Sequence, residues 1–238
     1  MRTSPPRVAV VTGAGRGLGL AIARQLAQGG DVHVFLTARR HAAAEKAAAE
    51  LVGTGLPVTG AELDVTDPAS VFRLFADVEQ THGRLDILVN NAGIAIDRGA
   101  VPSQPDIEVF QATLDTNLLG AVRCSSRAVP LMRRGGYGRI TNVSSHMGSL
   151  ALTEAANSPA YRISKAALNQ FTRVLAAETA NDGILVNAAS PGTVGTRMSY
   201  GRAEYTPEQA ASRLVRLSRL PVDGPTGRFF DGDTELPW

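Results

Sequence analysis

Tyr161 and Lys165 are two residues whose types and spacing suggest chemistry. Residues four positions apart lie on one face of a helix, so the phenol and the ammonium can point into one cleft. A phenol has a pKa of about 10, and a nearby cation lowers that value until the phenol exchanges a proton near neutral pH. The pair therefore predicts acid–base catalysis, and a surface pair on the same helix is the alternative.

The scarcity of lysine favours a functional role for this pair. Lys46 and Lys165 are the only lysines among the 24 basic residues, and the others are arginines. An ammonium and a guanidinium differ in shape, in hydration and in the ease with which they lose a proton. A lysine retained in such a chain indicates a position where arginine would fail.

A glycine-rich turn near the amino terminus predicts a nucleotide site. Residues 12–19 read TGAGRGLG, between a β-branched apolar run at 7–12 and a helix predicted over 16–28. Glycines there allow a tight turn, and backbone N–H groups at a helix start can approach a pyrophosphate. A glycine cluster alone is a weak signal, but its position between a strand and a helix makes it specific.

The motifs taken together resemble the short-chain dehydrogenase/reductase (SDR) family over nearly the whole chain. Several are weak singly, but all stand in the family's order. They are TGxxxGxG at 12–19, NNAG at 90–93, Asn117 in TNLLG, RITNVSS at 139–145, YxxxK from Tyr161 to Lys165, and PGxxxT from Pro191 to Thr196. The carboxyl-terminal segment 224–238 resembles the carbonyl-reductase-like branch.

The resemblance implies four catalytic residues, which are Asn117, Ser145, Tyr161 and Lys165. The family's serine stands three residues before a glycine, so Gly148 selects Ser145 over its neighbour in the sequence. It would bind the substrate carbonyl, and Tyr161 would protonate the carbonyl oxygen. The family also implies that Lys165 bonds the nicotinamide ribose and that Asn117 holds a water in a proton relay. A bend in the helix at Asn117 is the alternative.

The end of the second predicted strand indicates the cofactor. An NAD enzyme usually places a carboxylate there for the ribose hydroxyls, but here Ala38 takes that position and Arg39 follows. Arg16, inside the glycine motif, is a second cation, and two guanidiniums favour a 2′-phosphate. We therefore expect NADP(H). The predicted cofactor-binding residues are Gly13, Gly15, Arg16, Gly17, Leu18, Gly19, Arg39, Asp64, Val65, Asn91, Ala92, Gly93, Tyr161, Lys165, Pro191, Gly192, Val194 and Thr196.

The predicted substrate residues are Ile94, His146, Met147 and Met198, beside the ends of the strands. For His146, packing is as good an interpretation as substrate contact, and no metal site is predicted because metal-ligand partners are lacking. Between Ser145 and Tyr161 the chain is longer than in the shortest family members, so residues 149–158 are expected to reshape the mouth of the pocket.

The elements that must position these residues alternate regularly. Strands are predicted at 7–12, 32–36, 57–63, 85–89, 139–143 and 184–187, and helices at 16–28, 41–52, 66–81, 106–134 and 159–181. Continuous apolar strands between helices predict an α/β Rossmann fold, a doubly wound parallel sheet of about seven strands with helices on both faces. We expect one domain over 1–238 with a substrate loop or lid around 190–220.

Composition narrows the possible partners. The net charge is only +2 and the basic residues are scattered, which argues against a nucleic-acid partner. The apolar run at 8–11 is too short for a signal peptide or a membrane span, and the single cysteine, Cys124, favours the cytoplasm. The helices 106–134 and 159–181 suggest a homodimer or homotetramer, with Ala167, Leu168, Phe171 and Leu175 as an apolar face. The alternative is that this face packs only on its own sheet.

These observations predict an NADPH-dependent oxidoreductase that reduces a ketone or aldehyde substrate to an alcohol by hydride transfer. One alternative is a tailoring reductase that acts on an imine or conjugated carbonyl of a natural-product intermediate. Another is an NADPH-binding sensor or scaffold without turnover, although an intact set of catalytic residues argues against it.

Overall fold

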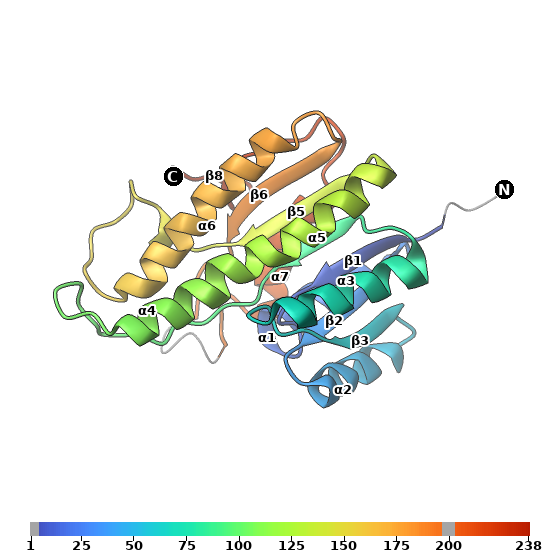
Figure 1. Cartoon of the computed structure of the whole chain (residues 1–238), viewed down its shortest axis with the longest axis horizontal. Helices are drawn as coiled ribbons and strands as arrows, with labels where there is room; N and C mark the ends of the chain where they lie inside the picture. The colour runs from blue at the N-terminus through green and yellow to red at the C-terminus, as the bar shows by residue number, and fades with distance from the viewer. Residues whose placement is uncertain (1–4, 197–202) are drawn as a thin grey trace.

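The computed structural model describes residues 5–196 and 203–238. Their strands form one sheet in the order β3-β2-β1-β4-β5-β6-β7-β8, parallel except for the last pair (Figure 1). The sequence predicted about seven strands, and the added β8 is a two-residue antiparallel strand at the edge. The strands are β1 Arg7–Val11, β2 Val32–Ala38, β3 Val58–Glu62, β4 Ile87–Asn90, β5 Gly138–Val143, β6 Ile184–Ser190, β7 Phe229–Asp231 and β8 Thr234–Glu235.

Helices cover both faces of this sheet, as expected for a doubly wound fold (Figure 1). One face packs against α1, α2 and α7, and the other against α3, α5 and α6. Side chains of β1 alternate between the two cores, which explains why the strand is apolar throughout. The helices are α1 Gly17–Ala27, α2 His41–Val52, α3 Pro68–His82, α4 Ile107–Leu114, α5 Gly120–Gly135, α6 Pro159–Glu178 and α7 Pro207–Val215.

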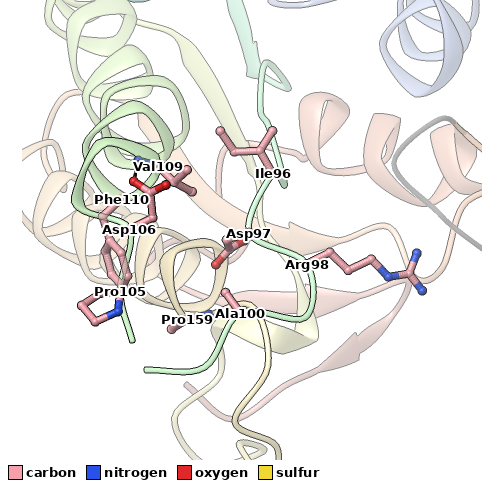
Figure 2. A pocket seen from close by; sticks show the side chains of 9 residues that line it. All are labelled: Ile96, Asp97, Arg98, Ala100, Pro105, Asp106, Val109, Phe110 and Pro159. Carbon is pink, nitrogen blue, oxygen red and sulfur yellow. Dashed lines mark hydrogen bonds between the residues drawn. The ribbon is translucent and has the colours of Figure 1, made fainter. Parts of the chain in front are cut away.

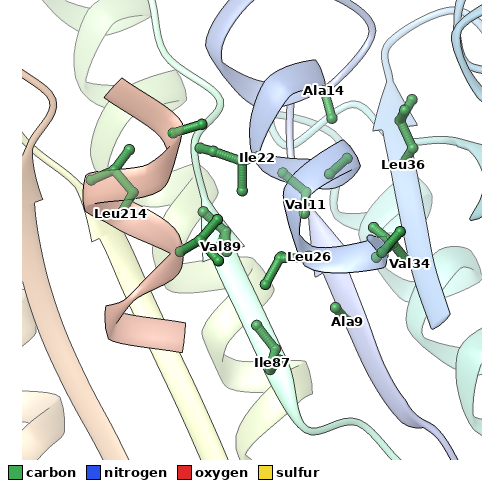
Figure 3. Close-up of a cluster of buried hydrophobic side chains, with 14 of the residues drawn as sticks. Ala9, Val11, Ala14, Ile22, Leu26, Val34, Leu36, Ile87, Val89 and Leu214 are labelled. Carbon is green, nitrogen blue, oxygen red and sulfur yellow. The ribbon is translucent and has the colours of Figure 1, made fainter. Parts of the chain in front are cut away.

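The core beneath α1 fixes the first turn of the nucleotide-binding unit. Ala9 and Val11 of β1 lie under Ile22 and Leu26 of α1, and all four side chains are buried (Figure 3). Close packing of a helix on the strand that precedes it sets where the connecting turn lies. The glycine motif is therefore held at the carboxyl end of β1.

The helix predicted over 106–134 is present as one unbroken helical stretch from Ile107 to Gly135, with a π-helical turn inside it. Residues Asp115–Leu119 form a π-helical turn between α4 and α5, and Asn117 lies in it, 1% exposed. A π turn inserts an extra residue and rotates the side chains that follow it. Asn117 therefore lies in a local irregularity of this helix, and its hydrogen-bond partners are described below.

Burial within the chain bears on the apolar face that was expected to join two copies of the protein. Leu168 and Leu175 of α6, expected on an apolar association face, are 1% and 6% exposed within a single chain. Phe171 also packs against the core under α6. In the part of the chain that the structure describes, no helix is long and apolar enough to cross a membrane.

Candidate functional site

The predicted site residues gather along the edge of the sheet where the parallel strands have their carboxyl ends. The order of the strands reverses at β1, whose neighbours are β2 and β4. Gly13 follows β1, Asn91 follows β4, Ser145 follows β5, and Pro191 follows β6. The crevice outside such a reversal point is where open α/β sheets bind ligands.

The Ser145 hydroxyl lies near the phenol of Tyr161 and, acting as a donor toward it, lowers the pKa of that phenol. Ser144, the other candidate, points away, because its Oγ donates to Oδ1 of Asn169 on α6 at 2.6 Å. The Ser145 oxygen also accepts the amide of Met147 at 3.2 Å, which orients it at the start of a short turn. The geometry therefore brings Ser145, and not Ser144, to the phenol.

Tyr161 and Lys165 share one face of α6, but the expected lowering of the phenol pKa is wrong for this structure. Desolvation around the hydroxyl raises the pKa of Tyr161, and the bond with Ser145 only partly offsets it. The Lys165 ammonium lies 5.7 Å from the centre of the ring, and it donates to the Val143 carbonyl at 2.7 Å. Burial lowers the pKa of Lys165 to about 8.

Asn117 fixes two neighbours of the site through its amide. Its Oδ1 accepts the Ile94 amide at 2.8 Å, and its Nδ2 donates to the Ile94 carbonyl and to Ser164 Oγ, each at 2.9 Å. Ser164 Oγ in turn donates to the Tyr161 carbonyl at 2.7 Å. Asn117 therefore connects the segment after β4 to the helix that carries the tyrosine, and its role in a water relay stays a prediction.

The glycine motif forms a cradle in which side chains have no room. Gly13 has a φ of 62°, and a Cβ there would lie 3.0 Å from the backbone of Ala92. A Cβ on Gly19 would lie 2.5 Å from Nδ2 of Asn91, which donates to the carbonyls of Thr12 and Gly13. The side chain of Arg16, at the cap position, makes no hydrogen bond to the amino end of α1. This arrangement fits the pyrophosphate of a dinucleotide.

Two arginines lie where the 2′-phosphate was expected. Arg16 and Arg39 are both exposed, and neither guanidinium is in an ion pair with any residue that the structure describes. Ala38, at the position where a carboxylate would favour NAD, lies against the loop, because a Cβ on Gly15 would be 3.1 Å from its Cβ.

The predicted adenine-contact residues lie after β3. Burial raises the pKa of the Asp64 carboxyl, but bonds from Thr66 and the charges of Arg39 and Arg123 outweigh it, so the net shift is downward. Asp64 is therefore ionised, with Oδ1 held by the Thr66 amide and hydroxyl at 2.9 and 2.7 Å. Val65 is buried against Gly120, where a Cβ would lie 2.7 Å from it.

The segment after β6 reaches back to the glycine motif. A Cβ on Gly17 would lie 3.5 Å from Thr196 Cγ2, so the two motifs meet. Gly192 has a φ of 73°, and a Cβ there would lie 2.6 Å from the ring of Tyr205. Val194 is buried and bridges to Tyr205. Of the predicted substrate residues, Met198 falls outside the described part of the chain.

His146 is held by residues of its own chain on both ring nitrogens. Its Nε2 lies 3.0 Å from Asp231 Oδ2, and its Nδ1 lies 3.4 Å from Ser190 Oγ. Asp231 also pairs with Arg213, which donates to the Tyr205 hydroxyl at 3.2 Å. These bonds orient the ring of His146, and both interpretations, packing and contact with substrate, stay predictions. No local motif pointed to Asp231, which is 85 positions away.

The segment 149–158 is tied to the carboxyl terminus. Ser149 Oγ donates to the Pro237 carbonyl at 2.8 Å, and the Ala151 amide donates to the Trp238 carbonyl at 3.0 Å. Trp238 stacks on Phe229 of β7. Together with Met147, this segment lines a cavity of about 200 Å³. The carboxyl-terminal aromatic residue therefore packs on the edge of the sheet.

The known proteins that this chain is similar to include dehydrogenases and reductases. A family model described as "short chain dehydrogenase" matches residues 7–206. Salutaridine reductase of Papaver somniferum is 32% identical, over 94% of this chain and 94% of its own length. The (+)-neomenthol dehydrogenase of Arabidopsis thaliana is 34% identical, over 97% of each. The solved structure of the Papaver somniferum salutaridine reductase matches with a TM-score of 0.83 and 30% identity, over 96% of this chain and 100% of that one.

Proposed function

Because the chain belongs to the short-chain dehydrogenase/reductase family of oxidoreductases, which use nicotinamide cofactors, we propose that it is an NADPH-dependent reductase of a ketone or aldehyde. The meeting of Ser145, Tyr161 and the buried Lys165 at one place in the fold is the observation that supports this proposal most. NADPH supplies the hydride when it is bound. Every other step falls to side chains of this chain.

Tyr161 is in the protonation state that a reduction needs. Because desolvation raises its pKa, the phenol keeps its proton at neutral pH and can give it to a carbonyl oxygen. The Ser145 hydroxyl has one proton to donate, and when it turns from the phenol to the substrate it can give a second hydrogen bond to the same oxygen. The two hydroxyls together place and polarise the carbonyl.

Lys165 stabilises the phenolate that this transfer leaves. With a pKa of about 8, its ammonium is mostly charged at neutral pH, and its charge opposes the charge that develops on Tyr161. One of its three donors is used by the Val143 carbonyl. The other two are available to a ribose hydroxyl.

The choice of NADPH is supported by charge. Arg16 and Arg39 are exposed beside the glycine motif. Ala38 stands where an NAD enzyme would have a carboxylate, so no negative charge there repels a phosphate. The glycine cradle and the start of α1, which the Arg16 side chain does not cap, suit the pyrophosphate of either dinucleotide. The two guanidiniums are therefore what would discriminate between NADPH and NADH.

A second candidate function is that of a tailoring reductase, which acts on one dedicated substrate with an imine or a conjugated carbonyl. Salutaridine reductase and (+)-neomenthol dehydrogenase each carry the name of one small molecule, which favours a narrow range over a general carbonyl reductase. We further propose a cytoplasmic homodimer or homotetramer, in line with the single cysteine and the apolar side chains exposed on α6.

The decisive experiment is turnover by the purified protein. NADPH oxidation is followed with a panel of activated ketones, aldehydes, imines and enones, and the product is identified by mass spectrometry. Alcohol formation that Tyr161→Phe abolishes supports the proposal, whereas amine or saturated-carbonyl products favour the tailoring candidate. Tight NADPH binding without turnover on any of these would instead indicate a sensor or scaffold.

A further inference from the structure

The amino end of α6 has no capping side chain of its own. Ser158 stands at the cap position with a φ of 52°, in the left-handed region, and its side chain makes no bond to the helix. Pro159 has no amide hydrogen, and the Arg162 amide donates to the Ser158 carbonyl at 3.0 Å. The amides of Ala160 and Tyr161 therefore remain without an acceptor inside the helix.

Asp97, from a distant part of the chain, accepts both of these amides. Its Oδ2 lies 2.7 Å from the Ala160 nitrogen and 3.2 Å from the Tyr161 nitrogen. The residue is 6% exposed, and a negative charge at the start of a helix is favoured by the helix dipole. Its Oδ1 is buried without a hydrogen-bond partner among the described residues, so the bonds to α6 are what hold the carboxylate.

Figure 2 shows where this contact lies. Asp97 stands on the segment between β4 and α4, beside Pro159 at the first turn of α6. Both residues line a cavity of about 200 Å³, to which Asp106 and Phe110 of the α4 region also contribute. Asp97 thus joins two segments that are 63 residues apart in the sequence.

The segment that ends in Asp97 is bonded at each step to a part of the site. Asn91 donates to the carbonyls of Thr12 and Gly13 in the glycine motif. Three residues later, Ile94 is held on both backbone groups by Asn117. Asp97 then holds the start of α6. One short stretch of chain therefore sets the distance between the cofactor cradle and the helix that carries Tyr161.

We infer that Asp97 is a positioning residue for Tyr161, capping α6 from outside the helix and fixing the phenol relative to the cofactor cradle. The inference rests on the proposed function, in which Tyr161 is the proton donor. The charge of Asp97 adds to desolvation in raising the pKa of Tyr161, while the bond with Ser145 lowers it. Asp97 therefore also helps the phenol to keep its proton.

Other charged groups surround this pair, so the test must rely on differences between variants. Lys165 faces the phenol from α6, and His146 follows Ser145 on the turn after β5 and pairs with Asp231. Arg98 and Asp106 line the cavity at Asp97. None of these groups is itself substituted when Asp97 alone is changed.

The test compares two substitutions at Asp97 with one matched control. Asp97→Asn keeps an oxygen for both amides and removes the charge, while Asp97→Ala removes both. Asp106→Asn is the control, because Asp106 caps α4 through the Val109 amide at 3.1 Å and lines the same cavity. The readouts are kcat/KM for reduction against pH, the NADPH dissociation constant, the melting temperature, and the ionisation of Tyr161 by ultraviolet difference titration against Tyr161→Phe.

In Asp97→Asn, we expect the fall of kcat/KM at high pH and the Tyr161 titration to move to lower pH together. NADPH binding should stay within about twofold, because the cradle is untouched. Asp97→Ala should lose kcat on the order of tenfold or more, since the displaced helix misplaces the phenol. Asp106→Asn should lower the melting temperature slightly without moving either titration.

Unchanged titrations in Asp97→Asn, or an equal shift in Asp106→Asn, would overturn the inference. If Asp97→Ala does not fold, Asp97→Asn decides alone, because it retains the cap. The two ideas fail differently. A Tyr161→Phe protein that still reduces ketones refutes the proposed function and with it the inference, whereas an inactive Tyr161→Phe beside an unaltered Asp97→Asn refutes the inference only.

Discussion

Asn117 bonds both backbone polar groups of Ile94, accepting from its amide at 2.8 Å and donating to its carbonyl at 2.9 Å. The π turn puts the asparagine in this place, 23 positions away in the sequence from its partner. Asn117→Ala should leave the half-buried backbone groups of Ile94 without this partner and cost about 1 kcal/mol of the free energy of unfolding. Turnover should fall as well, because Ser164 loses its donor beside Tyr161. Urea unfolding and kcat measure the two effects, and Asn181→Ala, at an exposed asparagine, should change neither.

Tyr161→Phe should lower kcat by about 10²–10⁴-fold, the usual contribution of a general acid. The ring is kept, so the melting temperature and NADPH affinity should remain close to those of the parent protein. Lys165→Arg should also lower kcat although it keeps the charge, because a planar guanidinium does not fit where the ammonium donates to the Val143 carbonyl. Stopped-flow NADPH oxidation measures these effects. Near-normal reduction by Tyr161→Phe would place the acid elsewhere, with His146 the next candidate.

Arg39→Asp should reverse or flatten the preference for NADPH over NADH. It replaces a cation at the end of β2 with the carboxylate that favours ribose hydroxyls and repels a 2′-phosphate. Dissociation constants of both cofactors, for the parent and the variant, test this directly. Arg40→Asp is the control, because Arg40 is also exposed and is the next residue in the chain. Equal affinities of the parent protein for both cofactors would contradict the NADPH assignment.

Lys165 should make the stability of the cofactor-free protein depend on pH. Burial lowers its pKa to about 8, from 10.5 for the free side chain. Between these values the unfolded chain binds a proton that the folded chain does not, so the free energy of unfolding rises with pH. Below about pH 8 the folded protein bears the full cost of the buried charge. Urea unfolding across this range should show a slope that Lys165→Met lacks, and identical slopes would refute the shift.

We expect sedimentation to give a mass of two or four chains at micromolar concentration. Because Leu168 and Leu175 are buried in their own chain, the association face on α6 would use Ile163 and Val174, which are 50% and 56% exposed. Val174→Asp should then dissociate the oligomer. Val52→Asp on α2, at a side chain 51% exposed, is the control. A mass of one 25.0 kDa chain would show that α6 serves its own sheet alone.

Local patterns were enough to predict most of the fold. Apolar runs followed by glycines and amphipathic helices predicted β1 through β6 and the helices between them, because periodicity and turn residues act over a few neighbouring positions. The edge strand β8 escaped prediction because two residues carry no periodicity. The π turn at Asn117 was not predicted either. It goes with hydrogen bonds from Asn117 to Ile94, a residue that is distant in the sequence, so no local pattern indicates it.

The sequence by itself determined the family and the choice of Ser145 over Ser144, because those depend on residue types at set spacings. Only the tertiary structure decided which distant groups meet, such as Asp97 with α6 and Asp231 with His146. It also decided that the pKa of Tyr161 is raised, whereas the spacing of Tyr161 and Lys165 alone had predicted that it is lowered. The physical reason is that spacing places charges near one another, whereas desolvation depends on everything that the fold packs around them.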